Sequence, residues 1–506
     1  MYGNLLSNMY FIVLDAGTSC IRCLVLNQMG EIVASKSNTW HYEAENNTSK
    51  FAVSFNSEKT WNTTCELIKN TLKNARINIK DIGAITATSQ RQGVVFLDTD
   101  GRELYLGPNL DLRAIFEGGY IDDQYLDEVF SATGHIPSLL FAPAKLRWFK
   151  LHKPEVFGKI TSILTLADWL LYKLGNNMIS EVSLASEIGM IDINKVQWYT
   201  VLLEKLDLIQ NDHIPLVKSG TVVAKITKKA SEDTGLPQHT PIVTAGADTQ
   251  CGLLGMGIQN DNHIGVVAGW STPIQTVINK PILSKDKSIW TGCYLMPNKW
   301  VIESNAGDGG NSYHWLSEII FENENDIYDK MEMLANNSPI GAQGTLAFLG
   351  PSRMDMTKLG MRQGGIIFPV PLTFNKINQS NLVRASLEAM AYAIKINIQQ
   401  IADITGKTPS KIVLGGGMIQ TQIWNKILAD VIGNPIEVSN TPYVSAVGAY
   451  MCASIGIGEF NSFEEADFNL QDRTKIIEND STASLEYIQY YEQWLQYYQW
   501  LESIEI

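Results

Sequence analysis

Cysteine is scarce in this chain, with six residues among 506. Six cysteines in a chain of this length do not form a disulfide framework, and such usage is typical of a reducing environment. Cys20 and Cys23 have CxxC spacing, but no second pair and no histidine cluster accompanies them. Because residues three apart on a strand point to opposite faces, we expect small packed side chains here rather than metal or redox ligands.

Long apolar runs and basic clusters are also missing. No apolar run approaches the ~20 residues that a membrane helix needs. The first residues carry neither a charged region nor a cleavage site, so we predict no signal peptide and expect a cytoplasmic protein. The net charge is −14, with no block of Lys or Arg. These features argue against a membrane, and against nucleic acid as the main partner.

Several phosphate-binding motifs are absent as well. Gly406-Lys407-Thr408 matches only the last part of a P-loop, because Ile401 stands at the first glycine position and Pro409 disfavours a helix start. The GxGxxG pattern and the protein-kinase signature set do not occur. A nucleotide, if bound, must therefore be held by another arrangement.

What the chain does contain is an alternation of strand-like and helix-like segments, typical of an α/β fold. Its length indicates two or more domains, and a glycine cluster at 252–257 marks the predicted break. An aromatic tail from Leu485 has helical spacing and is predicted to dock on a domain surface or a partner chain. The expected strands are 81–88, 94–97, 241–245, 263–268, 345–349 and 411–414, and the expected helices are 58–75, 382–404, 423–432 and the tail.

A hairpin-like segment, FIVLDAGTSCIRCLVL, occupies residues 11–26. Gly17 lets backbone N–H groups approach an anion, and Thr18 and Ser19 can add hydroxyl donors. Asp15 can hold Mg²⁺ or its bound water. The same residues also fit a tight β-hairpin with ordinary turn residues, so the segment alone leaves both interpretations open.

Further polar or glycine-rich turns follow other strand-like runs: Ser89–Gly93 (SQRQG), Asn109–Arg113 (NLDLR), Ile242–Gly252 (IVTAGADTQCG), Val266–Thr272 (VVAGWST) and Lys411–Met418 (KIVLGGGM). Ligands of α/β proteins bind where parallel strands end. Asp248 fits either a helix N-cap or a carboxylate at that edge. The amides and guanidinium of the SQRQG turn could bind a polyhydroxylated ligand, although each polar turn also fits a solvated loop.

In this order the motifs resemble the FGGY family of carbohydrate kinases, from about Phe11 to Glu465. Four further segments carry the resemblance: PAKLRW at 143–148, LADWL at 166–170, RASLEAMAYAI at 384–394 and GGGMIQTQIWNKILADVIGNPI at 415–436. The resemblance implies two actin-like (ribonuclease H-like) domains with a cleft between them. Residues 9–254 would bind the sugar, residues 255–475 would bind ATP, and residues 476–506 would form a helical tail.

The resemblance also implies roles for single residues. Asp248 matches the catalytic base that accepts the hydroxyl proton as the sugar attacks the γ-phosphate of ATP, and Asp15 lies where Mg²⁺ is held. The positions matching ATP contacts are Asp15, Gly17, Thr18, Ser19, Arg22, Gly269, Ser271, Gly416, Gly417 and Met418. The positions expected at the sugar or polyol are Gln90, Arg91, Gln92, Asn109, Asp111, Asp248 and Gln250.

Departures from the family pattern leave the substrate open. Trp270 stands where Thr is usual in the second phosphate loop, and Tyr443 stands where Glu is common. The SQRQG turn is nearer those of glycerol and autoinducer-2 kinases than those of xylulose kinases, with Gln92 in place of Glu. Autoinducer-2-like, xylulose or other pentulose, and glycerol-type substrates all remain candidates. The alternative functions are a catalytically weak sugar sensor and an actin-like ATPase, and the aromatic tail would suit a homodimer.

Overall fold

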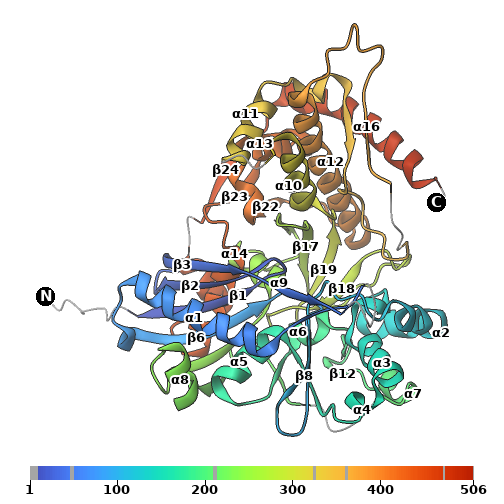
Figure 1. Cartoon of the computed structure of the whole chain (residues 1–506). Helices are drawn as coiled ribbons and strands as arrows, with labels where there is room; N and C mark the ends of the chain where they lie inside the picture. Colours follow the sequence, from blue (N-terminus) through green and yellow to red (C-terminus); the bar gives the residue numbers. More distant parts are fainter. Residues whose placement is uncertain are drawn as a thin grey trace, which may run out of the picture.

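The computed structural model describes residues 9–45, 51–208, 214–322, 326–358, 363–470 and 473–504. Figure 1 shows two α/β lobes, the lower formed mainly by the first half of the chain and the upper by the second half. Each lobe is built on one large sheet, which confirms the predicted α/β class. The extension at residues 1–8 lies outside the described residues.

The first sheet has the strand order β14-β15-β6-β1-β2-β3. Its strands are β1 (Tyr10–Ala16), β2 (Cys20–Asn27), β3 (Ile32–Thr39), β6 (Ile82–Ser89), β14 (Val222–Lys225) and β15 (Pro241–Ala247). β1, β2 and β3 form an antiparallel meander, whereas β6 is parallel to β1 and β15 is parallel to β6. The parallel strands therefore bring Asp15, the turn after Ser89, and Asp248 to one edge of the sheet.

The second sheet has the order β18-β19-β17-β16-β22-β23-β24. Its strands are β16 (His263–Val267), β17 (Pro273–Ile278), β18 (Trp290–Cys293), β19 (Trp300–Asn305), β22 (Lys411–Gly415), β23 (Ile436–Ser439) and β24 (Thr474–Ile477). Here β16, β17 and β19 form the meander, and β22 and β23 are parallel to β16. The two sheets thus repeat one topology, and the turn after β16 corresponds to the hairpin turn after β1.

Helices cover the sheets, and the sequence shows why two of the longest begin where they do. The Asn56 side chain accepts a hydrogen bond from Lys59 N at the start of α1, and Asn378 and Asn381 form a capping box on α12. The long helices are α1 (Ser57–Ala75), α2 (Ile115–Thr133), α3 (Ala142–His152), α5 (Leu166–Gly175), α10 (Gly309–Ile320), α11 (Ile327–Asn336), α12 (Gln379–Thr405), α13 (Gln422–Ile432), α14 (Val444–Gly456) and α16 (Ser481–Glu502). Shorter elements used below are α6 (Val182–Glu187), α9 (Asp248–Gly255), β7 (Val94–Leu97) and β20 (Leu346–Phe348).

Helices α9 and α14 pack against one another between the two sheets. A Cβ on Gly255 would lie 2.1 Å from Val444 O, and one on Gly448 would lie 1.9 Å from Cys251 O. The helices can approach this closely only without side chains at those points. The chain passes from the first sheet to the second between α9 and β16, and most of the glycine cluster at 252–257 belongs to this packed helix.

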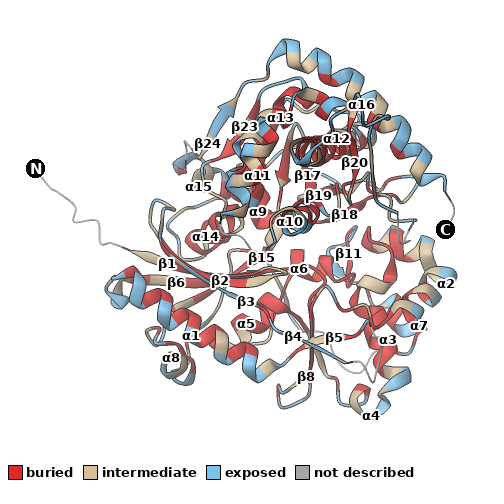
Figure 2. Cartoon of the chain, turned by 45° about the horizontal axis from the view of Figure 1, so that its top comes forward, coloured by how far each residue is buried: buried red, intermediate tan, exposed pale blue. Residues whose placement is uncertain are grey.

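Three large apolar cores stabilise the molecule, and Figure 2 shows buried residues running through both lobes. One core lies in each domain, and the third is shared. In the shared core, Phe11 and Val13 of β1 pack with Leu253 of α9 and Val447 of α14. Cys23 is buried in the first-domain core as predicted, while Cys20 is half-buried, and all six cysteines are free thiols. The inward face of the first sheet is thus tied to the helices that lead into the second domain.

The aromatic tail forms α16 and docks on its own second domain. Tyr487, Trp494 and Tyr498 are buried in that domain's core. Trp494 stacks on Phe348 with ring centroids 5.8 Å apart and donates to Ala347 O at 3.2 Å. The predicted helix is confirmed, and most of its aromatic spacing serves contacts within the chain. Within the described residues, no helix is both long enough and apolar enough to span a membrane.

Candidate active site

The β1–β2 hairpin presents its turn at the edge where the parallel strands end. Asp15 is buried at the end of β1, and its Oδ2 lies 3.3 Å from Arg22 Nη1 on β2. Burial raises the pKa of Asp15, and Arg22 opposes that rise. A Cβ on Gly17 would meet no atom closer than 3.7 Å, so the turn backbone is open to an approaching group. The hairpin therefore offers one carboxylate and one guanidinium beside an accessible backbone.

Side chains of the next two turns brace this hairpin. Gln90 Nε2 donates to Gly17 O at 3.3 Å, and Gln90 Oε1 accepts from Asn109 N at 2.9 Å. Asn109 Nδ2 donates to Thr18 Oγ1 at 2.9 Å. Fully buried Lys145 of α3 donates from Nζ to Gln92 O at 3.1 Å and to Pro108 O at 3.5 Å. The SQRQG and NLDLR turns are thus fixed to each other and to the hairpin.

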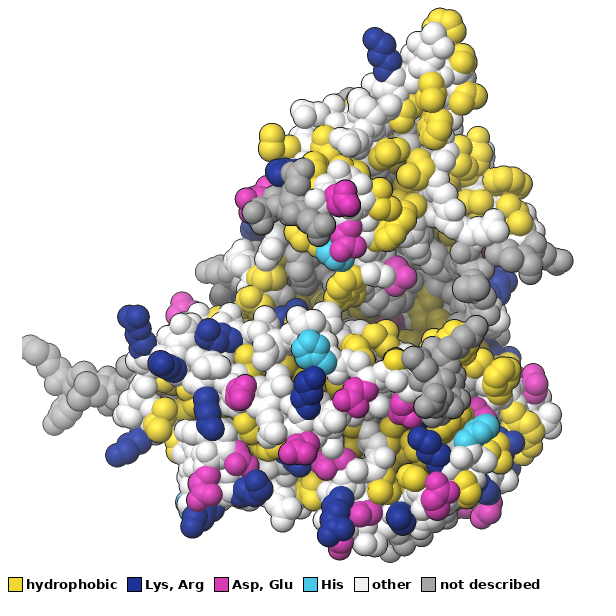
Figure 3. Space-filling model, in the orientation of Figure 1, with side chains coloured by type: hydrophobic (Ala, Val, Ile, Leu, Met, Phe, Trp, Pro, Cys, Tyr) yellow, Lys and Arg dark blue, Asp and Glu magenta, His cyan; other side chains and the backbone are white. Residues whose placement is uncertain are grey.

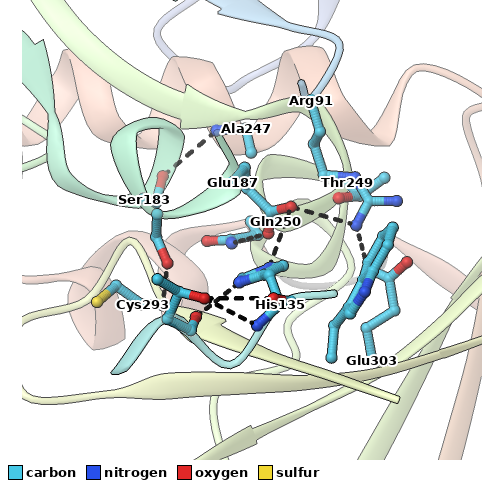
Figure 4. A network of polar contacts seen from close by, with 12 residues as sticks. Arg91, His135, Ser183, Glu187, Ala247, Thr249, Gln250, Cys293 and Glu303 are labelled. Carbon is cyan, nitrogen blue, oxygen red and sulfur yellow. Dashed lines mark hydrogen bonds and ion pairs between the residues drawn. The ribbon is translucent and has the colours of Figure 1, made fainter. Parts of the chain in front are cut away.

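A buried ionic network surrounds Arg91 (Figure 4). Its guanidinium pairs with Glu303 and lies 3.5 Å from Glu187 Oε2. Burial alone would lower the pKa of Arg91, but the two carboxylates outweigh it and raise the pKa. Glu187 ends α6 in the first domain, whereas Glu303 belongs to β19 of the second sheet. Arg91 therefore ties the first-domain turn to the second domain.

The same network holds two glutamines and a histidine. Gln250 Nε2 donates to Glu187 Oε1 at 3.0 Å, and Gln275 Nε2 donates to Glu303 Oε2 at 2.6 Å. His135 Nε2 lies 3.8 Å from Glu187 Oε2, and burial lowers the pKa of this histidine to about 4, so its ring is neutral near pH 7. Three buried oxygens here, Gln250 Oε1, Gln275 Oε1 and Glu187 Oε2, have no hydrogen-bond partner. Unpaired buried polar atoms are rare and indicate a place for a ligand or water.

Asp248 is close enough to Asp15 of the hairpin and to Arg91 and Glu187 of this network for their charges to act on it. It is the first residue of α9, half-buried, and its Oδ1 accepts from Thr249 N at 2.7 Å. The N-cap is Ala247, so the N-cap interpretation of Asp248 is wrong. Burial raises the pKa of Asp248 to about 7, with Arg91 lowering it and Asp15 raising it further. A carboxylate with this pKa can exchange a proton near neutral pH.

A cavity of about 420 Å³ opens beside the hairpin. Arg22 lines it from the first domain, so the cavity lies between the two domains. The second-domain residues that line it are Gly269, Trp270, Gly310, His314, Tyr328, Asp329, Glu332, Gly417, Met418, Gln420 and Thr421. Gly416 has φ 90°, and a Cβ there would lie 2.6 Å from Ala268 O, so the turn after β22 requires glycine. Ser271 belongs to the same turn as Gly269 and accepts from Gly269 N at 3.0 Å.

Most of the predicted site residues lie around the hairpin, the polar network or the cavity. Asp111 is an exception. Asp111 uses both carboxylate oxygens inside the first domain, accepting from Val53 N at 3.0 Å and from Arg113 Nε at 2.6 Å and pairing with Tyr105 OH. Sequence reasoning missed Glu187, Glu303, Gln275, His135 and Lys145, which complete the network and brace the turns. A glutamate inside an otherwise strand-like run, as in WVIESN, was the available signal, because buried carboxylates occur only with partners.

Two sheets of one topology, with a cavity between them that a phosphate-type hairpin helps to line, are the arrangement expected of two-domain sugar-kinase-like proteins. Comparison with known proteins agrees with this. The chain matches the FGGY family of carbohydrate kinases, N-terminal domain, over residues 10–255 and the C-terminal domain over residues 266–457. The chain belongs to this family, whose actin-like two-domain fold and kinase activity it shares. It is a phosphotransferase with an alcohol group as acceptor, and the family uses ATP as the phosphate donor.

Individual relatives differ in the substrate that their names state. The autoinducer-2 kinase of Escherichia coli K12 is 28% identical over 473 residues, covering 91% of this chain and 88% of the relative. A ligand-bound xylulose kinase from Lactobacillus acidophilus superposes with a TM-score of 0.86 at 16% identity, over 98% of this chain and 99% of that one. A gluconate kinase from the same organism gives the same values, and so low an identity shows the fold alone.

Proposed function

We propose that this chain transfers the γ-phosphate of ATP to a hydroxyl of a small sugar or polyol, with Asp248 as the catalytic base. The observation that carries the proposal is the position of Asp248 in the electrostatic field of both Asp15, on the hairpin, and Arg91, in the polar network. A base whose pKa lies near the working pH combines the correct protonation state with useful driving force. Asp248 would accept the hydroxyl proton while the oxygen attacks phosphorus.

The nucleotide is proposed to occupy the cavity of about 420 Å³, with its phosphates toward the hairpin and the turn at Gly269. Arg22 lines that cavity and can stabilise charge on the transferring group. Mg²⁺ fits at Asp15, because this ion is usually held by one or two carboxylates together with substrate phosphates and water. Among the described residues, no group of three or more Asp, Glu, Cys or His side chains is placed so that the protein alone could hold a metal ion.

The acceptor is proposed to lie against Arg91, Gln92 and Gln250, beside Asp248. Gln92 Nε2 is buried without a partner, as is Gln250 Oε1, so a polyhydroxylated molecule would satisfy both. The autoinducer-2 kinase relative makes an autoinducer-2-like acceptor the first candidate, and xylulose-type and glycerol-type acceptors remain candidates from the sequence. Closure of the two domains would exclude water, which competes as a phosphoryl acceptor.

The test is replacement of the base. We expect Asp248→Asn to lower kcat by about 10²- to 10⁴-fold, the usual contribution of a general base. ATP affinity, measured by calorimetry, should stay within about threefold because the substitution lies outside the cavity lining. Asp100→Asn, on an exposed loop, is the matched control. Turnover near the wild-type rate in the Asp248 variant would remove this residue from the role of base.

A further inference from the structure

The unpaired atoms around Arg91 are mostly acceptors. Gln250 and Gln275 are fully buried, and each donates its amide hydrogen to a carboxylate, Glu187 or Glu303. A carboxylate only accepts, so these bonds fix the orientation of both amides and leave each Oε1 as the free atom. Glu187 Oε2 is also without a hydrogen bond, although it lies 3.5 Å from Arg91. Three buried oxygens are therefore available to hydrogen-bond donors of a bound molecule or of water.

The charge balance of the network disfavours a negatively charged ligand. Arg91 is paired with both Glu187 and Glu303, so two carboxylates share one guanidinium. Asp248 and Asp15 add two further carboxyl groups, while Arg22 is already paired with Asp15. His135, the other basic side chain of the network, has a depressed pKa of about 4 and brings no compensating charge near pH 7. A further anion placed here would be buried without a counter-ion, which is costly.

We propose that Glu187 and Glu303 restrict the acceptor to uncharged polyhydroxylated molecules and exclude sugar acids. A hydroxyl can donate to Gln250 Oε1, Gln275 Oε1 or Glu187 Oε2 and can also accept from Gln92 Nε2. The carboxylate of an aldonic acid can only accept, and it meets an excess of like charge. This inference rests on the proposed function and narrows its substrate class. It separates this chain from the structurally similar gluconate kinase, whose named substrate is an acid.

The test compares acceptors in pairs of equal carbon number: glycerol with D-glycerate, xylitol and D-xylulose with D-xylonate, and D-glucitol with D-gluconate. ADP release in the wild-type enzyme with ATP and Mg²⁺ gives kcat/KM for each, and calorimetry without ATP gives acceptor binding. We expect turnover with a neutral member and at least about 100-fold lower kcat/KM with its acid, since an uncompensated buried charge costs several kcal/mol. An acid used as well as its neutral partner overturns the inference while leaving the kinase function intact. If no molecule of either kind, with an autoinducer-2-like acceptor added to the neutral set, stimulates ADP release, the proposed kinase function fails, and this inference falls with it.

A variant then assigns the discrimination to a residue. Glu187→Gln removes one negative charge at nearly constant shape. We expect the ratio of kcat/KM for a neutral acceptor to that for its acid to fall about tenfold or more. A tenfold change corresponds to a charge–charge interaction of about 1.4 kcal/mol. Glu128→Gln, which removes an exposed carboxylate paired with Lys205, should leave the preference unchanged. A preference that is the same in the Glu187 variant and in the wild type overturns the role of Glu187.

Discussion

The two walls of the cleft are built by the same sheet topology but by different means. On the first-domain wall, side chains fix the positions of the binding residues. Lys145, Gln90 and Asn109 form hydrogen bonds that hold the SQRQG and NLDLR turns and the hairpin in place, and an ionic network holds Arg91. On the second-domain wall, the turns that carry Gly269 and Gly416 are shaped by close backbone contact. Figure 3 shows a similar contrast outside, with charged side chains gathered on the lower lobe and apolar ones prominent on the upper.

This contrast suggests a division of labour. Polar side chains can distinguish the hydroxyl pattern of one acceptor from another, because each unsatisfied group has a direction and a sign. Backbone N–H groups bind any phosphate chain, and glycine lets them come close. We call the first-domain wall the acceptor wall and the second-domain wall the nucleotide wall. Acceptor binding should therefore tolerate changes in the backbone of its wall but respond to side-chain replacement there. Nucleotide binding should tolerate side-chain replacement on its wall but respond to changes in the backbone. Three experiments test that expectation.

The largest effect is expected from Gly416→Ala on the nucleotide wall. The residue would be held at φ 90° with its Cβ 2.6 Å from Ala268 O, a strain on the order of 1–3 kcal/mol. We expect a similar loss in the free energy of unfolding, measured by urea denaturation. Relaxation of the turn should weaken ATP binding about 10- to 100-fold in calorimetry, since 1.4 kcal/mol is a factor of ten.

Substitutions at two other glycines distinguish the possible causes of weaker ATP binding: the positive φ, the steric clash and a contact with the nucleotide. Gly433 has φ 83° and no atom within 4 Å of its Cβ position, so Gly433→Ala tests positive φ without a clash and should leave ATP binding unchanged. Gly417 lines the cavity and also has open space around that position. Gly417→Ala should weaken ATP binding without loss of stability if the nucleotide touches the backbone there. Normal ATP binding by Gly416→Ala would mean that this wall does not depend on its backbone.

The next effect concerns Lys145 on the acceptor wall. Removing two charge-assisted hydrogen bonds that hold the acceptor turns, in Lys145→Met, should raise the acceptor KM about tenfold, at about 1 kcal/mol or more per bond. ATP affinity should not change. Lys150→Met is the control on the same helix: Lys150 also donates to two carbonyls, Leu206 O and Asp207 O, far from these turns. An equal rise in KM in both variants would contradict a positioning role for Lys145.

Lys145 also predicts a pH dependence of stability. Burial lowers its pKa to about 8, with Asp111 opposing and Arg113 reinforcing the shift. Between pH 8 and the unfolded-state pKa of about 10.5, the unfolded chain binds more protons than the folded one, so this group makes the free energy of unfolding rise with pH. Urea denaturation of wild type and Lys145→Met across pH 7 to 10 measures the difference, and the variant should lack this rise. Parallel pH curves for the two proteins would contradict it.

The fold was more accessible to sequence reasoning than the site. The alternation of strand-like and helix-like segments located β7 at Val94–Leu97 without error and the ends of α1 and α13 within one residue, whereas helices such as α2 and α14 were not predicted. The hairpin, Asp248 and the glycine turn could be found because their chemistry is local in the chain. The pairing of Glu187 and Glu303 with Arg91 could not be found, because the three residues are distant in sequence and only the folded chain brings them together.

The smallest effect is expected from Trp270→Thr, at one of the positions where the sequence analysis expects a departure from the family pattern. The indole lines the cavity but is 44% exposed, and its ring contact is with His314, centroids 5.6 Å apart. The backbone hydrogen bond from Asn311 N to Trp270 O would be kept with threonine at this position.

If the nucleotide wall acts through its backbone, the ATP affinity of Trp270→Thr should weaken by no more than about threefold, within the range of surface substitutions. Trp315→Thr, at a similarly exposed tryptophan on α10, is the control. Stacking of a base on an aromatic ring contributes about 1–3 kcal/mol, so a loss beyond tenfold in Trp270→Thr alone would show that a side chain binds the nucleotide and would break the contrast between the two walls.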